Sequence, residues 1–218
     1  MALGHSPSIV TSGLVFCVDV ANIKSNPNNT NIYDISGVGN SCTISGPITF
    51  DTANNMGALT LNGANTWVTV AKPLSGGNTT PFTLMAVART NTASSWQTVL
   101  GTVGTFRQIG FLNSTFQFGG NGGAGNLFVA GGTTSVGQWC HLAMTFDGTT
   151  AYGYFNKAQT TGNIGANAGT IGNSVLGSYN GGNEILNGNI AMAQIYNRAL
   201  TAAEVTQNFN AIRGRFGL

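Results

Sequence analysis

The strongest pattern of apolar and polar positions lies near the end of the chain, in residues 186–200. Apolar side chains fill both sets of alternate positions there: Ile190, Met192 and Tyr196 in one set, Ala191, Ala193 and Ile195 in the other. A strand with one solvated face alternates apolar with polar residues, whereas a strand covered on both faces reads as a nearly continuous apolar run. The pattern therefore predicts a central strand that is buried on both sides.

A helix is predicted directly after this strand. Thr201 is followed three residues later by Glu204, which is the spacing of a capping box, where each residue bonds the backbone of the other. Apolar residues then recur at helical spacing, at Val205, Phe209 and Ile212. Gly214 is the predicted stop of this helix, because glycine commonly ends helices.

Short apolar runs at a spacing of roughly 8–12 residues predict about a dozen further strands. These runs are Leu14–Val20, Cys42–Ile44, Ile48–Phe50, Ala58–Leu61, Thr66–Val70, Phe82–Arg89, Thr98–Gly101, Phe106–Phe111, Thr115–Gly119, Asn126–Ala130, Trp139–Phe146, Thr150–Asn156 and Asn173–Gly177. Asn62–Gly63 and Asp147–Gly148 each separate two runs, and such dipeptides suit hairpin turns. The whole pattern predicts an all-β sandwich or jelly roll with a short C-terminal helix.

One domain is expected for a chain of 218 residues, since β-sandwiches of about this length are common. Residues 1–12 show little periodicity and are predicted to form an extended N-terminal arm. Residues 13–200 form the β-domain, and residues 201–218 form the capped helix and a C-terminal tail. Both short ends are expected to be free to dock on neighbouring subunits.

The composition is poor in charge, with 6% charged residues and a net charge of +2. Basic residues are mostly isolated from one another, which argues against nucleic acid as a partner. Only Arg198, Arg213 and Arg215 gather. They are interpreted either as solvated charges that complement a helix end or as part of a contact surface with Phe216.

The three cysteines, Cys17, Cys42 and Cys140, cannot all pair within one chain. Cys17 and Cys140 lie in apolar strand patterns and are expected to be buried free thiols. The N-terminus lacks the pattern of a secretory signal peptide, and no apolar run approaches the roughly 20 residues that span a membrane. We therefore expect a protein made in a cytoplasm, without membrane insertion and without export by the general secretory route.

Several segments carry a family resemblance through their order and spacing. They are Gly13–Asp19, Tyr33–Gly37, Leu61–Gly63, Gln138–Gly148 and Asn187–Thr201. Together they resemble the laminin-G-like branch of the concanavalin-A-like lectin/glucanase superfamily, and Arg213–Leu218 resembles the ending of such domains in tailed-phage structural proteins. The resemblance implies a jelly roll of two curved antiparallel sheets. Members include lectins, adhesion modules and glycan-cleaving enzymes, so the fold does not set the activity.

The catalytic pattern of the family's enzymes is missing from the sequence. Those enzymes resemble one another in a Glu-x-Asp-x-x-Glu strand, and retaining hydrolysis needs two carboxyl groups about 5–5.5 Å apart. The acidic residues here are Asp19, Asp34, Asp51, Asp147, Glu184 and Glu204, all far apart in the sequence. His141 matches the family's Trp-x-His, which belongs to the scaffold. We expect no enzymatic activity, with glycoside hydrolysis as a remote alternative, and no cofactor.

A calcium ion at the rim of the sandwich is implied by the resemblance, because family members often hold one through oxygen ligands. Related sequences commonly carry aspartates at two places that here read Ala64–Asn65–Thr66 and Ala191–Met192. We therefore expect no metal site at these positions. A weak site near Asp34 or Asp147 is left as a remote alternative.

Glycan binding needs an aromatic platform beside amide and hydroxyl groups. The candidates are Trp67 with Asn65 and Trp96 with Gln97. The alternative is that both tryptophans cover the edge of the core or fill a subunit contact. Trp139 is expected to pack in the core.

The leading hypothesis from the sequence is a non-enzymatic structural protein on the surface of a phage particle, as a head decoration or a fibre and adhesin component. Its expected partners are other virion proteins and further copies of itself, with Arg198, Arg213, Arg215 and Phe216 at the interface. The alternative is a carbohydrate-binding module that recognises host-surface glycans.

Overall fold

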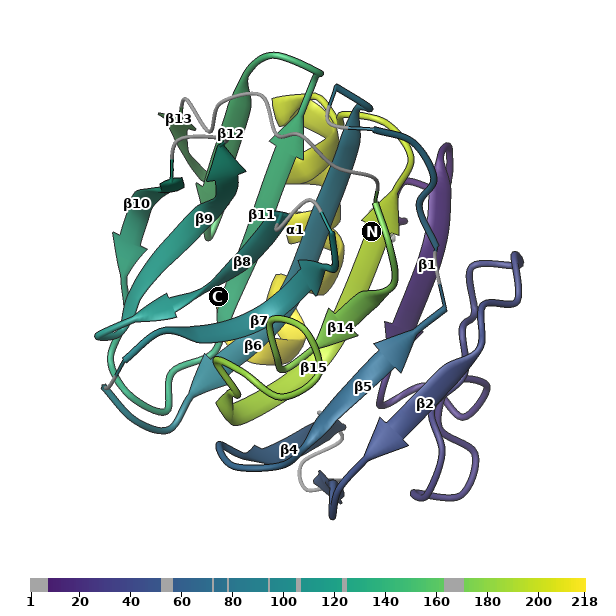
Figure 1. Ribbon diagram of the computed structural model, residues 1–218. Coiled ribbons are helices and arrows are strands. Elements are labelled where there is room, and N and C mark those ends of the chain that lie inside the picture. The colour runs from purple at the N-terminus through teal and green to yellow at the C-terminus, as the bar shows by residue number, and fades with distance from the viewer. Residues whose placement is uncertain are drawn as a thin grey trace, which may run out of the picture.

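A computed structural model describes residues 8–51, 57–71, 73–77, 79–93, 95–104, 107–122, 125–162 and 171–218. The structure is a sandwich of two antiparallel sheets with one helix (Figure 1), which confirms the predicted fold class. The strands are β1 (Leu14–Asp19), β2 (Cys42–Ser45), β3 (Thr49–Asp51), β4 (Ala58–Asn62), β5 (Trp67–Val70), β6 (Phe82–Thr90), β7 (Gln97–Thr102), β8 (Arg107–Leu112), β9 (Thr115–Gly122), β10 (Gly125–Thr133), β11 (Cys140–Phe146), β12 (Ala151–Phe155), β13 (Ala158–Gly162), β14 (Ser174–Leu176) and β15 (Asn187–Tyr196), and the helix is α1 (Ala202–Phe216).

The eight-stranded sheet is built around β15. Its order is β13-β12-β11-β6-β15-β4-β3, and β1 also pairs with β15. On one side β15 runs along β6, and on the other it pairs first with β4 and then with β1. The seven-stranded sheet has the order β10-β9-β8-β7-β14-β5-β2. The last strand of the chain therefore completes the larger sheet at its centre, as its apolar pattern predicts.

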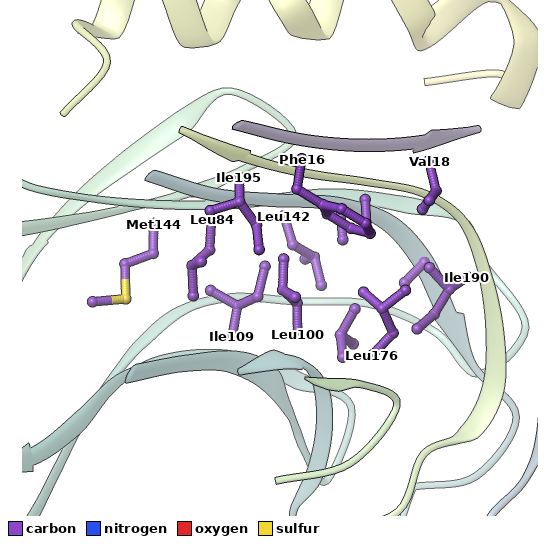
Figure 2. Packing of buried hydrophobic residues seen from close by; sticks show 14 of the residues in the cluster. Phe16, Val18, Leu84, Leu100, Ile109, Leu142, Met144, Leu176, Ile190 and Ile195 are labelled. Atoms are coloured by element: carbon purple, nitrogen blue, oxygen red, sulfur yellow. The ribbon is translucent and has the colours of Figure 1, made fainter. Parts of the chain in front are cut away.

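The core lies between the two sheets (Figure 2). Phe16, Leu84 and Ile195 point inward from the eight-stranded sheet and meet Leu100 and Ile109 of the other sheet. All five side chains are fully buried. Burying an aliphatic or aromatic side chain of this size contributes roughly 1.5–3 kcal/mol relative to leaving it exposed, so this layer is the main source of stability.

The second face of β15 is covered by α1, which lies behind the eight-stranded sheet in Figure 1. Tyr196 is fully buried there, with Val205 and Leu200 in the same cluster. The Tyr196 hydroxyl donates to the Val10 carbonyl at 3.0 Å and accepts from Asn208 Nδ2 at 2.9 Å. Both faces of β15 are thus buried.

No helix in the described ranges has the length and apolarity needed to cross a membrane.

The hairpin expected around Asn62–Gly63 is wrong, whereas the hairpin around Asp147–Gly148 is confirmed by the pairing of β11 with β12. β4 belongs to the eight-stranded sheet and β5 to the seven-stranded one. The chain crosses between the sheets at residues 62–66, and the Asn62 side chain holds this crossing by accepting hydrogen bonds from Ala64 N and Thr66 Oγ1. An asparagine that bonds the backbone two residues ahead stabilises such a connection as well as a hairpin turn.

The C-terminal helix is longer than predicted. The capping box of Thr201 and Glu204 is present as expected, but α1 continues through Gly214 to Phe216. It ends at Gly217, whose φ of 68° is the left-handed conformation typical of a helix C-cap. A helical glycine costs about 1 kcal/mol relative to alanine, and the burial of Phe216 outweighs that cost. The helix and its cap therefore occupy residues for which a C-terminal tail was predicted.

The described part of the N-terminal arm is also packed on its own domain. Val10 is buried, and its backbone N–H donates to Asn208 Oδ1 at 2.7 Å. The Ser8 carbonyl accepts from Gln207 and the Ser12 carbonyl from Arg198. The expected free arm is thus wrong for residues 8–12, because β15 and α1 offer it hydrogen bonds and an apolar surface. Residues 1–7 lie outside the described residues.

Candidate functional site

A pocket of about 480 Å³ opens at one end of the sandwich. Three connections meet there: the β4–β5 crossing, the β6–β7 loop, and the β14–β15 loop, which lies beside β7 and β15 in Figure 1. The lining is polar except for one indole and a few small or aliphatic side chains. It consists of Gly63, Ala64, Thr92, Ser95, Trp96, Gln97, Gly182, Asn183, Glu184, Ile185 and Asn187.

The β14–β15 loop, residues 177–186, is held in one shape by its own hydrogen bonds. Ser178 Oγ donates to the Asn183 carbonyl at 2.8 Å and accepts from Gly182 N at 3.0 Å. The Leu186 N–H closes the base of the loop by donating to the Gly177 carbonyl at 2.9 Å. The loop therefore presents Asn183 and Glu184 to the pocket from a fixed backbone.

Glu184 is the point where this loop joins the seven-stranded sheet. Its carbonyl accepts from Thr98 N at 2.8 Å, and Ile185 forms a parallel bridge with Thr98. The Glu184 backbone has φ 52°, a left-handed conformation that costs energy for residues other than glycine. Such strain persists only where surrounding contacts enforce it, and it is found often at functional sites.

Two buried side chains of the seven-stranded sheet contact the Glu184 carboxylate. Glu184 Oε2 lies 2.9 Å from Thr98 Oγ1 and accepts from Gln108 Nε2 at 3.2 Å. Burial raises the pKa of Glu184, and the hydrogen bonds from Thr98 and Gln108 offset only part of that rise. The carboxylate is thus a partly desolvated acceptor, and both of its side-chain bonds use the same oxygen.

Trp96 forms an aromatic wall of the pocket. Its Nε1–H donates to Thr98 Oγ1 at 3.1 Å, which joins the indole to the network around Glu184. Its ring centroid lies 4.2 Å from that of Phe128, with 42° between the ring planes. The indole is half-buried and fixed at its edge. An amphipathic ring held in this way can contact the apolar face of a ligand while its N–H stays satisfied.

Two of the four predicted glycan-binding residues, Trp96 and Gln97, lie together in the pocket lining. The Gln97 side chain, however, is buried and makes hydrogen bonds within the protein. Gln97 is only 3% exposed. Its Nε2 donates to the Thr92 carbonyl at 3.1 Å, and its Oε1 accepts from Asn187 N at 2.9 Å. Gln97 therefore ties the β6–β7 loop to the start of β15 and supports the wall behind Trp96.

Trp67 and Asn65 are not among the described residues that line the pocket. The half-buried Trp67 supports the β14–β15 loop, because a Cβ built on Gly181 would lie 3.3 Å from Trp67 Nε1. Gly181 has φ 82°, which favours glycine there independently of the space. Asn65 is exposed, and its Oδ1 accepts from Asn62 Nδ2 at 2.7 Å. Any role of these two residues in binding stays a prediction.

Asn183 and Glu184 line the pocket, but they are not among the binding residues that the sequence predicts. The available signal is the segment 179–184, in which tyrosine, two asparagines and a glutamate flank a Gly-Gly pair between two strands. Thr98 and Gln108, which contact the carboxylate, are buried inside strands. Nothing in their local sequence distinguishes them from structural residues.

The predicted interface residues mostly contact their own chain. Arg198 donates to both carboxylate oxygens of Glu204, at 2.9 and 2.6 Å, and Arg215 donates to both oxygens of Asp19 at 2.9 Å. Phe216 packs against Trp139 with ring centroids 5.2 Å apart. Arg213 is exposed on the last turn of α1. An interface role for these four residues stays a prediction.

No group of three or more His, Cys, Asp or Glu side chains that could hold a metal ion occurs among the described residues. Asp34, one of the remote calcium candidates, accepts hydrogen bonds from Cys17 N, Ser36 N and Asn40 N. Asp147 bonds Thr149 and Thr150 in its turn. Both carboxylates are therefore engaged in fixing local backbone.

Comparison with known proteins gives a family and a set of similar folds. The family model described as the concanavalin A-like lectin/glucanases superfamily matches residues 62–206. The binding domain of Paraclostridial Mosquitocidal Protein 1 superposes with a TM-score of 0.71 at 17% identity, covering 91% of this chain and 52% of that one. The binding domain of botulinum neurotoxin DC in complex with SialylT gives 0.70 at 11% identity, covering 93% and 52%.

Domain 4 of AbnA, a GH43 extracellular arabinanase from Geobacillus stearothermophilus, solved in complex with arabinotriose, gives a TM-score of 0.65 at 19% identity. It covers 90% of this chain and 98% of that one, whereas this chain spans about half the length of the toxin binding domains. No curated protein matched the sequence. At these identities the structural likeness concerns the fold. Since the family model covers most of the chain, this protein belongs to the concanavalin A-like lectin/glucanase superfamily.

Proposed function

We propose that this protein is a non-enzymatic carbohydrate-binding domain that holds a glycan in the Trp96 pocket. The observation that carries the proposal is the fixed, half-buried indole of Trp96 beside amide and hydroxyl groups in one concavity. Sugars combine an apolar C–H face with hydroxyl groups around the ring. A wall of indole and a rim of Asn183, Asn187 and Thr92 complement both features.

Two similar folds support this proposal through what their structures contain. The neurotoxin domain was solved with SialylT and the arabinanase domain with arabinotriose. The proposal that the domain lacks enzymatic activity is supported by the pocket, where Glu184 is the one carboxylate among the lining residues that the structure describes. Glycoside hydrolysis ordinarily needs a pair.

The test is binding of a panel of oligosaccharides to the protein and to Trp96→Ala, measured by calorimetry. We expect the variant to lose at least about fivefold in affinity, since stacking of a nucleobase on one aromatic ring is worth about 1–3 kcal/mol and the apolar face of a sugar packs on an indole in a similar way. Tyr33→Ala is the matched control, because Tyr33 is an aromatic residue that is 49% exposed and does not line this pocket. Equal affinity for Trp96→Ala and the unaltered protein would contradict the proposal.

A phage virion role, expected from the sequence, is not the function that we propose. One of the observations behind that expectation was a pair of free ends that could dock on neighbouring subunits, and the described parts of both ends pack on their own domain. Location in a particle, virion partners and self-association stay predictions, and they are compatible with glycan binding. Labelling of intact particles with an antibody against this protein tests them directly.

A further inference from the structure

We infer that the Trp96 pocket selects neutral glycans and excludes sugars that carry a carboxylate, such as sialic and uronic acids. The inference rests on the proposed function, because it names the class of glycan that the same pocket would accept. Its basis is the charge of the lining and the geometry of Glu184.

The charge of the pocket comes from one residue. Among the described residues that line the pocket, Glu184 is the only ionisable one, and none of them is a lysine, arginine or histidine. An acidic sugar bound there would bring its carboxylate near that of Glu184 without a cation between them. Two like charges a few ångströms apart repel strongly where water is partly excluded.

The geometry of Glu184 favours a hydroxyl donor instead. The Thr98 and Gln108 contacts both reach Oε2, so Oε1 keeps its lone pairs for a ligand. A sugar hydroxyl that donates to a carboxylate makes a charge-assisted hydrogen bond, which is shorter and stronger than a neutral one. Asn183 and Asn187, which can donate and accept, lie in the same lining. The same carboxylate therefore attracts a polyol and repels an anion.

The carboxylate cannot easily turn away from an acidic ligand. Its backbone is fixed by the Thr98 N–H and by the Ile185–Thr98 bridge, and its side chain is fixed by buried Thr98 and Gln108. The folded site therefore holds the Glu184 carboxylate in the position from which it repels an acidic ligand.

The test compares neutral sugars with acidic counterparts. Galactotriose is paired with trigalacturonate, in which carboxylates replace the hydroxymethyl groups, and lactose is paired with 3′-sialyllactose, which adds one sialic acid residue. Arabinotriose is a further neutral probe. Affinities are measured at 20 mM and at 500 mM salt for the unaltered protein, Glu184→Gln and Asp51→Asn. Asp51→Asn removes the same charge from β3, outside the pocket. Melting temperatures of all three proteins confirm that each is folded.

We expect at least one neutral probe to bind the unaltered protein at least tenfold more tightly than its acidic counterpart at 20 mM salt. The gap should narrow at 500 mM salt, because salt screens repulsion. Glu184→Gln should narrow it to threefold or less, and Asp51→Asn should leave it unchanged. Equal binding of both members of a pair by the unaltered protein, or an undiminished gap in Glu184→Gln, overturns the inference while glycan binding stands. Absence of binding by every probe to every protein overturns the proposed function as well.

Discussion

At the scale of single residues, the pocket contains a carboxylate, that of Glu184, at a position where a neutral side chain would make the folded protein more stable. Glu184 is partly buried and has a left-handed backbone, and no cation occurs among the described residues of its pocket lining. Burial of a carboxylate without a counter-charge disfavours its ionised form, and here it raises the pKa of Glu184. The residue therefore costs stability at neutral pH.

Replacing Glu184 by glutamine should stabilise the protein at pH 7 by up to about 1 kcal/mol, because the amide removes the cost of desolvating a charge and keeps the shape. A raised pKa means that the folded state binds the proton more readily than the unfolded one. The unaltered protein should therefore gain stability as the pH falls from 7 toward the ordinary pKa of glutamate, and the advantage of the variant should shrink. Urea unfolding at several pH values measures this. A variant less stable than the unaltered protein at pH 7 contradicts the prediction.

The sequence could predict Trp96, because an aromatic residue in a polar loop is a recognisable binding candidate. It could not predict that Gln97, its neighbour, turns inward to bond Thr92 and Asn187. Glu184 is a single charge in a glycine- and asparagine-rich loop, and its importance depends on contacts with Thr98 and Gln108. Those contacts arise only from the fold.

At the scale of elements, α1 packs against the eight-stranded sheet over the buried side chain of His141. Among the described residues, no group lies within hydrogen-bond reach of either ring nitrogen of His141. The His141 ring packs edge-on against the Phe209 ring of α1 with the ring centroids 5.6 Å apart, and Lys157 Nζ lies 5.8 Å from the Phe209 ring. Burial lowers the pKa of His141 to about 4.

We expect the packing of α1 to weaken in acid for this reason. The folded pKa of His141 is lower than the unfolded value of about 6.5, so the unfolded state binds more protons between these values. The free energy of unfolding should therefore fall as the pH drops from about 6.5 to 4. The full difference between the folded and unfolded pKa of His141 corresponds to a loss of roughly 2–3 kcal/mol over this range. In His141→Leu this part of the loss should disappear. Hydrogen exchange of α1 amides and urea unfolding across this range test it, and an equal acid loss in both proteins contradicts it.

The elements themselves were predictable where the pattern is local. The alternation in residues 186–200 predicts β15, and the spacing of Thr201 and Glu204 predicts the start of α1. The partner of a strand is not local: Asn62–Gly63 would suit a hairpin, but β4 finds its partners in β15 and β3. The end of α1 depends likewise on tertiary contacts, since Phe216 and Arg215 gain partners in Trp139 and Asp19.

At the scale of the whole molecule, closure of the sandwich creates the pocket. β15 completes the eight-stranded sheet, and the loop before it pairs with β7 of the other sheet through the Thr98–Ile185 bridge. This brings Glu184 beside Trp96 at one end of the domain. Composition and motifs predicted the fold class, but the pocket could not be predicted because it is assembled from three connections far apart in the sequence.

Glycan binding in the Trp96 pocket is tested most directly by adding a neutral glycan and following the three tryptophan indole N–H signals in a nitrogen–proton NMR spectrum. The chain has three tryptophans, and Trp139 packs against Phe216, outside the pocket. We predict that the Trp96 Nε1–H signal shifts in a saturable manner, since the sugar contacts an indole whose N–H is bonded to Thr98. The Trp139 signal should not move. Saturable shifts at Trp139 or Trp67 with an unchanged Trp96 signal would contradict glycan binding in the Trp96 pocket.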